Sequence, residues 1–167
     1  MKVWIMKLMP VLLALSVTHA VAADFRIGVV DTERILRESA PALKAEKKIE
    51  KEFAVRDQEI KSISQQAKDI QTLLDKEGMT LPDAERRNKE RELDNLNVNL
   101  QRLQREFRED LNLRKNEELV MVLGLANKAI QQIAESEKYD LVLQEAVYRN
   151  PKIDITDRVI KFLANEK

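Results

Sequence analysis

Several residue types are scarce in this 167-residue chain, and each scarcity removes a class of function. Cysteine is absent, which excludes disulfides, and the sequence has one histidine, His19, and one tryptophan, Trp4. Zinc sites take His or Cys ligands, and Ser-His and Cys-His nucleophile pairs need a histidine, so neither is predicted. The only glycines, Gly28, Gly78 and Gly124, do not have the spacing of a phosphate-binding loop. We therefore expect a protein that is not an enzyme and takes no cofactor.

The first 23 residues have the pattern of an export signal. Lys2 and Lys7 supply positive charge, and an apolar run over residues 8–17 follows. This run is too short to span a bilayer comfortably, so a retained membrane anchor is the less favoured alternative. Small residues place the cleavage site after Ala22 or Ala23. Cleavage removes the histidine and the tryptophan and, with the loss of both lysines, leaves 27 basic residues against 29 acidic ones.

Two long amphipathic stretches, over about residues 42–76 and 83–137, dominate what remains. Apolar residues recur in each at alternating four- and three-residue steps, the period of a coiled-coil seam, which Arg56 interrupts once. The seam residues are Ile49, Phe53, Ile60, Ile63, Ala67, Ile70 and Leu74, then Leu93, Leu96, Leu100, Leu103 and Phe107. A break over residues 77–82 reverses the chain, with Gly78 ending the first helix, Pro82 opening the second, and Thr80 forming a capping box with Asp83. The pattern predicts an antiparallel hairpin with arms of roughly 50–80 Å.

Only about 50 residues remain for a globular part, a size that is marginal without disulfides, metal or self-association. We expect strands at residues 26–30, 139–144 and 146–149, a short helix capped by Asp31 or Thr32, and a final helix capped by Asp154 or Thr156. Residues 119–133 are apolar almost all round, which predicts a helix buried on every side, and we expect Gly124 to allow close packing there. With metal and disulfides excluded, self-association is the remaining source of stability.

Charged clusters on the predicted helices have a simple explanation as solvated faces. Arg86, Arg87 and Lys89 are candidates for contact with anionic lipid, but neighbouring Asp and Glu residues balance them. Glu117 and Glu118 lie among Arg and Lys, so ion pairing is favoured over acid–base catalysis. The slightly acidic total and the lack of stacking aromatics argue against nucleic-acid binding.

Four segments together resemble the Skp/OmpH family of periplasmic chaperones over essentially the whole mature chain. They are Ile27-Gly28-Val29-Val30-Asp31, Arg114-Lys115-Asn116-Glu117-Glu118-Leu119, Tyr139-Asp140-Leu141-Val142-Leu143 and Asp154-Ile155-Thr156-Asp157-Arg158-Val159-Ile160. The resemblance implies a homotrimer in the periplasm, whose three subunits complete a β-barrel-like core. Three helical tentacles then enclose a cavity that holds unfolded outer-membrane proteins without using nucleotide. It also implies weak contact with lipopolysaccharide or anionic phospholipid, although this chain is closer to neutral than many members.

The expected fold is therefore mainly α with a small β component: a long antiparallel hairpin, the tentacle, projecting from a small α/β body that trimerises. Residues 24–41 and 115–167 would form the body, and residues 42–114 the tentacle. We expect client contacts at Leu73, Met79, Leu81 and Val98. We expect the trimer core to include Ile27, Val29, Leu119, Val122, Leu123, Ala126, Leu141 and Leu143. The alternative function is a structural coiled-coil adaptor of the cell envelope that binds one folded partner.

Overall fold

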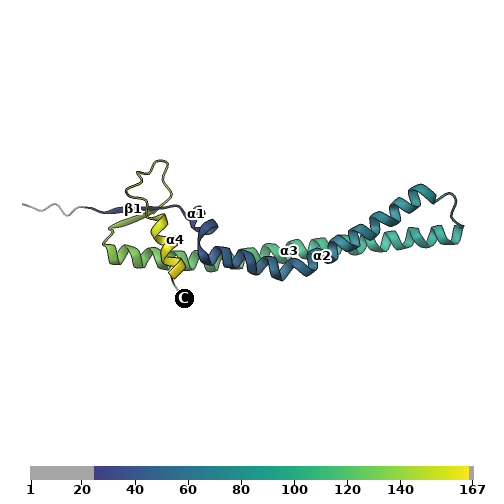
Figure 1. Ribbon diagram of the computed structural model, residues 1–167, viewed down its shortest axis with the longest axis horizontal. Helices are drawn as coiled ribbons and strands as arrows, with labels where there is room; N and C mark the ends of the chain where they lie inside the picture. The colour runs from purple at the N-terminus through teal and green to yellow at the C-terminus, as the bar shows by residue number, and fades with distance from the viewer. Residues whose placement is uncertain (1–24, 166–167) are drawn as a thin grey trace, which may run out of the picture.

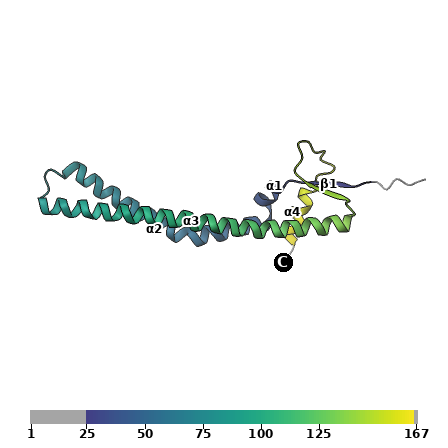
Figure 2. The ribbon, with the colours of Figure 1, turned by 180° about the vertical axis from the view of Figure 1, so that it is seen from behind.

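The computed structural model describes residues 25–165, and the predicted export signal lies outside this range. A small body sits at one end, and two long helices run from it as a narrow hairpin (Figures 1 and 2). The chain order is β1, α1, α2, α3, β2, α4. This is the predicted class, mainly helical with a small β component. In the described range, no helix is long and apolar enough to cross a membrane.

The β component is a parallel pair, β1 (Ile27–Val30) and β2 (Leu141–Gln144), with Ile27 opposite Leu141. Parallel strands need a long crossover, and here the whole helical hairpin provides it. Tyr139 and Asp140 precede β2 instead of opening it, because Lys138 takes a left-handed conformation with φ 57° to end α3.

The predicted third strand, over residues 146–149, is wrong. Glu145 has a φ of 66°, which turns the chain off the sheet immediately after β2. Residues 145–150 form an irregular loop with Val147 and Tyr148 exposed. The second contact that β1 makes in this chain is an isolated bridge between Val29 and Asp154.

Side-chain caps fix where the shorter helices begin. Asp31 accepts a hydrogen bond from the Arg34 N–H at 2.9 Å and caps α1 (Thr32–Glu38). Ser39 caps α2, which begins at Ala40 and holds Pro41 in its first turn, where a missing N–H costs nothing. Asp154 accepts from the Thr156 N–H at 2.9 Å at the start of α4 (Thr156–Asn165). The sequence offered two capping residues for each of α1 and α4, Asp31 or Thr32 and Asp154 or Thr156. In the structure, Asp31 and Asp154 accept the hydrogen bonds.

The body has a compact apolar core gathered from almost every element. α1 contributes Ile35, α4 and its approach contribute Ile155 and Val159, and all three are fully buried. The other buried members are Val30, Ala126, Ala129, Ile133 and Leu163. Only the face of α3 that carries its Ala and Ile residues enters this core, so most of the residues 119–125 lie outside it.

The hairpin consists of α2 (Ala40–Glu77, 38 residues) and α3 (Asp83–Glu137, 55 residues). At 1.5 Å per residue they are about 57 and 82 Å long. Phe53 and Phe107 meet edge to face across the seam, with ring centroids 5.4 Å apart. Arg56, which interrupts the heptad pattern, lies over the Phe53 ring and forms an ion pair with Asp110 at 2.8 Å. The apolar stem of an arginine thus fits a seam position while its charge is paired.

At the tip, Gly78 ends α2 and Pro82 precedes α3, as predicted. Gly78 has an ordinary right-handed conformation, and it is needed because a Cβ there would lie 2.3 Å from the Leu74 carbonyl oxygen. The predicted capping box is wrong. Thr80 donates its hydroxyl to the Glu77 carbonyl oxygen at 2.8 Å, and α3 has no side-chain cap.

Candidate assembly and client-binding surfaces

The root of α3 exposes a large apolar patch, contrary to the expectation that this segment is buried on every side. Leu119, Val120, Met121 and Leu125 are 42, 69, 48 and 41% exposed. The body of a single chain is too small to cover more than one face of the helix, so the other face meets solvent. Gly124 has open space around it, since a Cβ there would meet nothing within 4 Å, and the close packing expected there is not found within residues 25–165. Apolar patches of this kind commonly mark an interaction site.

The predicted trimer-core residues fall into three groups by exposure. Val29, Val122 and Ala126 are already buried by their own chain. Ile27 and Leu123 are half-buried. The remaining three are at least 41% exposed: Leu119, Leu141 and Leu143. Only the exposed and half-buried members are available for contact with another chain.

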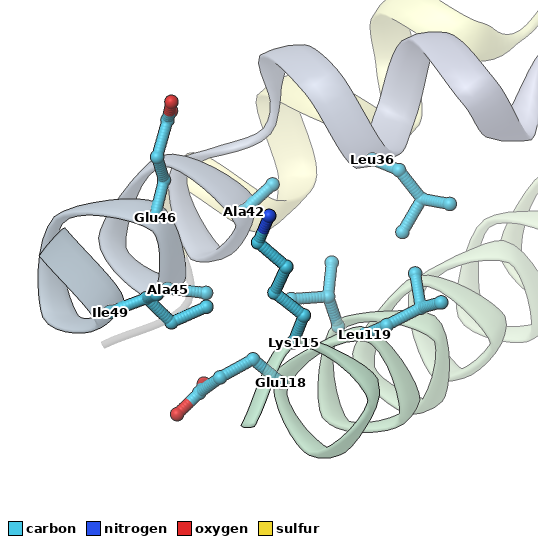
Figure 3. Close-up of a pocket in the computed structure, with 9 residues that line it drawn as sticks. Leu36, Ala42, Ala45, Glu46, Ile49, Lys115, Glu118 and Leu119 are labelled. Atoms are coloured by element: carbon cyan, nitrogen blue, oxygen red, sulfur yellow. The ribbon is translucent and has the colours of Figure 1, made fainter. Parts of the chain in front are cut away.

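An apolar groove of about 250 Å³ lies beside this patch, where α1, α2 and α3 meet (Figure 3). Leu36, Ile49 and Leu119 come from three different helices and line it, and Val122 and two alanines of α2 contribute the rest of its apolar wall. Glu46 and Lys115 provide charge at its edge. The groove extends the apolar surface of the α3 root onto the hairpin.

Glu118 anchors the two long helices at the same level. Its side chain is only 8% exposed, and its Oε1 atom lies 2.8 Å from Lys48 Nζ and 2.8 Å from Arg114 Nη2. The adjacent Lys48 ammonium is the largest influence on the Glu118 carboxyl and lowers its pKa, against the opposing effect of burial. Arg114 also bonds Glu52 on α2 and Glu117 on its own helix, so the cluster joins the arms where they leave the body.

A second polar network holds the loop that follows β2. Arg149 bonds Asp31 at 2.9 Å and Asp154 at 3.0 Å. The pKa of Asp31 is lowered, first by the hydrogen bond from the Arg34 N–H and then by Arg149. Burial would raise the pKa of Asp154, but hydrogen bonds from Thr156 outweigh it and the pKa is lowered. Both carboxylates are thus held ionised as caps and as anchors for the loop.

The four predicted client-contact residues differ in exposure. Met79 at the tip and Val98 on α3 are fully or largely exposed, at 102 and 69%. Leu73 and Leu81 are half-buried. Two exposed and two half-buried positions on one hairpin do not form a single pocket, and any binding through them is distributed along the arm.

The predicted anionic-lipid residues are largely neutralised by their neighbours. Arg86 lies 3.7 Å from Asp83 and 4.0 Å from Glu90. Lys89 forms an ion pair with Glu92 at 2.8 Å. Arg87 is exposed. The geometry agrees with a balanced helix surface at this position.

Sequence reasoning missed two features at the hairpin root: the apolar groove and a row of lysines on α2. The row, Lys44, Lys47, Lys48 and Lys51, has the i, i+3, i+4, i+7 spacing of one helix face, and this spacing was a usable signal. The groove had no such signal, because it depends on how α1 meets the hairpin. In residues 25–165, no three His, Cys, Asp or Glu side chains are grouped to hold a metal ion.

Known proteins give a consistent classification. Residues 26–163 match the family model described as outer membrane protein (OmpH-like). The chain is 28% identical to chaperone protein Skp of Blochmanniella pennsylvanica, covering 96% of this chain and 93% of the relative. It is 25% identical to chaperone protein Skp of Yersinia enterocolitica, covering 89 and 92%.

A solved structure shares the fold. The crystal structure of a putative outer membrane chaperone (OmpH-like) from Caulobacter crescentus aligns with a TM-score of 0.68 over 85% of each chain, at 18% sequence identity. The family model spans both strands, the hairpin and most of α4, so the match covers the body as well as the arms. The chain therefore belongs to the Skp/OmpH family of outer-membrane-protein chaperones.

Proposed function

We propose that the mature chain is an ATP-independent periplasmic holdase that binds unfolded outer-membrane proteins and delays their aggregation. The observation that carries this proposal is the hairpin itself. Two helices of 38 and 55 residues project from a small body, and their far end holds no core of its own. Such an arm does little for the stability of the body and offers a long surface to a partner. Relatives named as chaperones support the proposal.

We propose that three copies assemble through the body, residues 24–41 and 115–167, and leave residues 42–114 as tentacles. A single chain exposes Leu119, Met121 and Leu125 on α3 and Leu141 and Leu143 on β2. The outer edge of β2 is also unpaired within residues 25–165, and proteins normally cover such edges. Assembly around these surfaces would bury the apolar patch and extend the sheet toward a β-barrel-like core.

Weak, distributed contacts suit a holdase that releases its client without fuel. Exposed apolar residues such as Met79 and Val98 stand apart on a charged surface. Three arms acting together raise the effective concentration of such contacts and strengthen overall binding. Because unfolded chains expose more apolar segments than folded ones, the holdase binds them preferentially and releases them as they fold or insert.

The decisive experiment is an aggregation assay. An outer-membrane β-barrel protein is diluted from urea, and light scattering is followed with and without the mature chain, in the absence of ATP. We expect scattering to be delayed for several unrelated barrel clients. No delay at a threefold molar excess of protomers would refute the holdase function, and stoichiometric binding of one folded protein would favour the envelope adaptor.

Two controls connect the assay to the structure. The double variant Met79→Ser with Val98→Ser should shorten the delay, whereas Asn97→Ser with Gln101→Ser, at exposed polar positions of the same hairpin, should not. Sedimentation should give three chains per particle. A folded monomer at micromolar concentration would contradict the proposed cavity.

A further inference from the structure

The tip of the hairpin presents one methionine side chain entirely to solvent. Met79 is 102% exposed, whereas Gly78 and Leu81 in the same turn are half-buried. Hydrogen bonds fix this turn, because the Glu77 carbonyl oxygen accepts from the Thr80 N–H at 2.9 Å and from the Leu81 N–H at 3.1 Å. The turn therefore holds the Met79 thioether in solvent, unshielded by the rest of residues 25–165.

The mature chain offers an oxidant few other sulfur atoms. Cysteine is absent, and three of the five methionines, Met1, Met6 and Met9, lie in the predicted export signal. Only Met79 and Met121 remain after its removal. Met121 is 48% exposed in a single chain, and it lies on the apolar patch that the proposed assembly would bury. In the assembled particle, the sulfur that meets an oxidant first is therefore that of Met79.

We propose that Met79 is a site of reversible oxidation, and that its sulfoxide weakens binding of the unfolded client at the hairpin tip; this rests on the holdase function proposed above. The oxidant is a peroxide. A lone pair of the sulfur attacks one oxygen of hydrogen peroxide, the S–O bond forms as the O–O bond breaks, and water leaves after proton transfer. Sulfur gives up two electrons and the peroxide is reduced. Methionine sulfoxide reductases reverse the step, and two thiols then become a disulfide as water is released.

Oxidation changes the chemistry of this contact without disturbing the fold. A thioether is apolar and flexible and adapts to many apolar segments, whereas a sulfoxide is polar and chiral. An apolar client side chain that packs on the sulfoxide removes water from its oxygen and supplies no hydrogen bond, which is unfavourable. Because Met79 is fully exposed in the described range, the turn and the seam keep their contacts. The modification thus acts on binding, unlike oxidation of a core methionine, which disrupts packing.

The position of Met79 makes the effect graded. The tip is the end of the hairpin farthest from the body, so an assembly of three chains carries three copies of this side chain at its free ends (Figure 1). Val98, the other largely exposed client-contact candidate, has no sulfur and is unaffected by the same oxidant. Oxidation therefore removes the contacts at the tip and keeps those along the arm, and client binding is weakened instead of abolished.

The test uses the assembled mature protein, treated with hydrogen peroxide and freed of it by catalase before any client is added. Peptide mapping by mass spectrometry follows the gain of one oxygen atom at Met79 and at Met121. Affinity for a fluorescently labelled, urea-diluted barrel protein is then measured by titration, before and after repair by methionine sulfoxide reductases A and B with dithiothreitol. Met79→Leu keeps an apolar side chain of similar size without sulfur, and Met121→Leu is the matched control that leaves the tip intact.

We expect Met79 to gain oxygen before Met121. Affinity should fall roughly fivefold as Met79 is converted, since burying about half of a methionine side chain contributes a factor of that order. Repair by the reductases should restore it. Met121→Leu should respond to peroxide as the parent does, and Met79→Leu should show one affinity before and after peroxide, whatever its starting value. While only Met79 is oxidised, thermal unfolding by circular dichroism should stay unchanged.

Three results would overturn the proposal. Oxidation of Met121 as fast as Met79 would show that the tip is not the preferred site. Unchanged affinity once Met79 carries its oxygen atom would show that the sulfoxide does not affect client binding. An equal loss after peroxide in the parent and in Met79→Leu would assign the effect to another group. In each case the untreated parent can still delay client aggregation, so this inference fails separately from the holdase function.

Discussion

The aromatic contact in the middle of the hairpin allows a quantitative test of how the arm is held together. Phe53 is 6% exposed and meets Phe107 edge to face, with the Arg56 guanidinium 5.6 Å from the Phe53 centroid. Replacing a core phenylalanine by alanine costs about 3–5 kcal/mol in a globular protein. A two-helix seam has solvent on both sides, so the gap can fill with water, and we expect about 2–3 kcal/mol for Phe53→Ala. The aromatic geometry itself should account for about 0.5–1.5 kcal/mol of this.

The assay is a double-mutant cycle. Urea unfolding of Phe53→Ala, Phe107→Ala and the double variant gives the free energy that couples the two rings. Val55→Ala, on the same helix but 77% exposed, is the control and should change stability by less than about 0.5 kcal/mol. Hydrogen exchange should show faster opening of α2 and α3 around the substituted positions, with the core around Ile35 and Val159 still protected.

Two outcomes would refute this reasoning. If Phe53→Ala costs less than about 0.5 kcal/mol, the seam contributes little and the helices are held by their charges or by the neighbouring arms. If the body loses exchange protection as early as the hairpin does, the two are one cooperative unit. The arm could not then open without dissolving the core.

Three further predictions concern other parts of the molecule. The carboxyl of Glu118 has a lowered pKa, so its contribution to folding stability is present above the unfolded pKa of 4.5 and is lost as the pH falls through the lower folded pKa. The melting temperature should therefore drop in that acidic range, and Glu118→Gln should make the drop smaller. Leu100→Pro should lower the free energy of unfolding of the hairpin by about 3 kcal/mol and bend α3. Client holding should weaken in the aggregation assay, while sedimentation still shows the assembled particle. Loss of assembly would contradict the division into body and hairpin. Gly28→Val should destabilise the body by about 1–3 kcal/mol in urea unfolding, since even a Cβ would lie 3.2 Å from Ile155 and 3.3 Å from Tyr139, whereas an unchanged midpoint would show that these side chains move aside freely.

The helical part of the fold could be predicted from sequence because its signals are local. The heptad spacing around Phe53 and Phe107 and the turn residues Gly78 and Pro82 define the hairpin, and the structure confirms both helices and the reversal. Arg56 looked like a defect in the pattern. Its ion pair with Asp110 explains why it is tolerated, but that partner lies on the other helix and cannot be found by periodicity.

The body was harder to predict from sequence, because its structure depends on contacts between segments that are distant in the chain. Residues 146–149 have the composition of a strand, but a strand needs a neighbour, and Arg149 is drawn instead to Asp31 and Asp154. The apolar character of residues 119–125 was read correctly, but burial depends on how much protein is available to cover the helix. One small body covers one face only, and Leu119 and Val120 stay exposed.

For the candidate surfaces too, sequence spacing predicts which residues share a helix face, but their exposure and their partners depend on the folded structure. The lysines of α2 can be found by spacing alone, whereas the absence of ion-pair partners for Lys44, Lys47 and Lys51 within residues 25–165 could be seen only from the positions of the nearby carboxylates. Exposure separated Met79 and Val98 from Leu73 and Leu81, which look equivalent in the sequence. Charge at the tip was correctly expected to be balanced, because Asp83, Glu90 and Glu92 are close in the chain.

The parallel pairing of β1 with β2 sets an order for folding. The two strands are far apart in the sequence, with α1, α2 and α3 between them, and closing so long a loop at random carries an entropic cost that grows with its length. Helices α2 and α3 are joined by a short turn, so they can begin to pair there, and each further contact along the hairpin brings the two strands closer together. We therefore expect the hairpin to guide the folding of its own body: β1 remains without its partner strand until the segment after α3 is available, and is then brought next to β2 by helices that have already formed. Substitutions that slow the pairing of α2 with α3 should therefore delay folding of the body, even where they do not contact it.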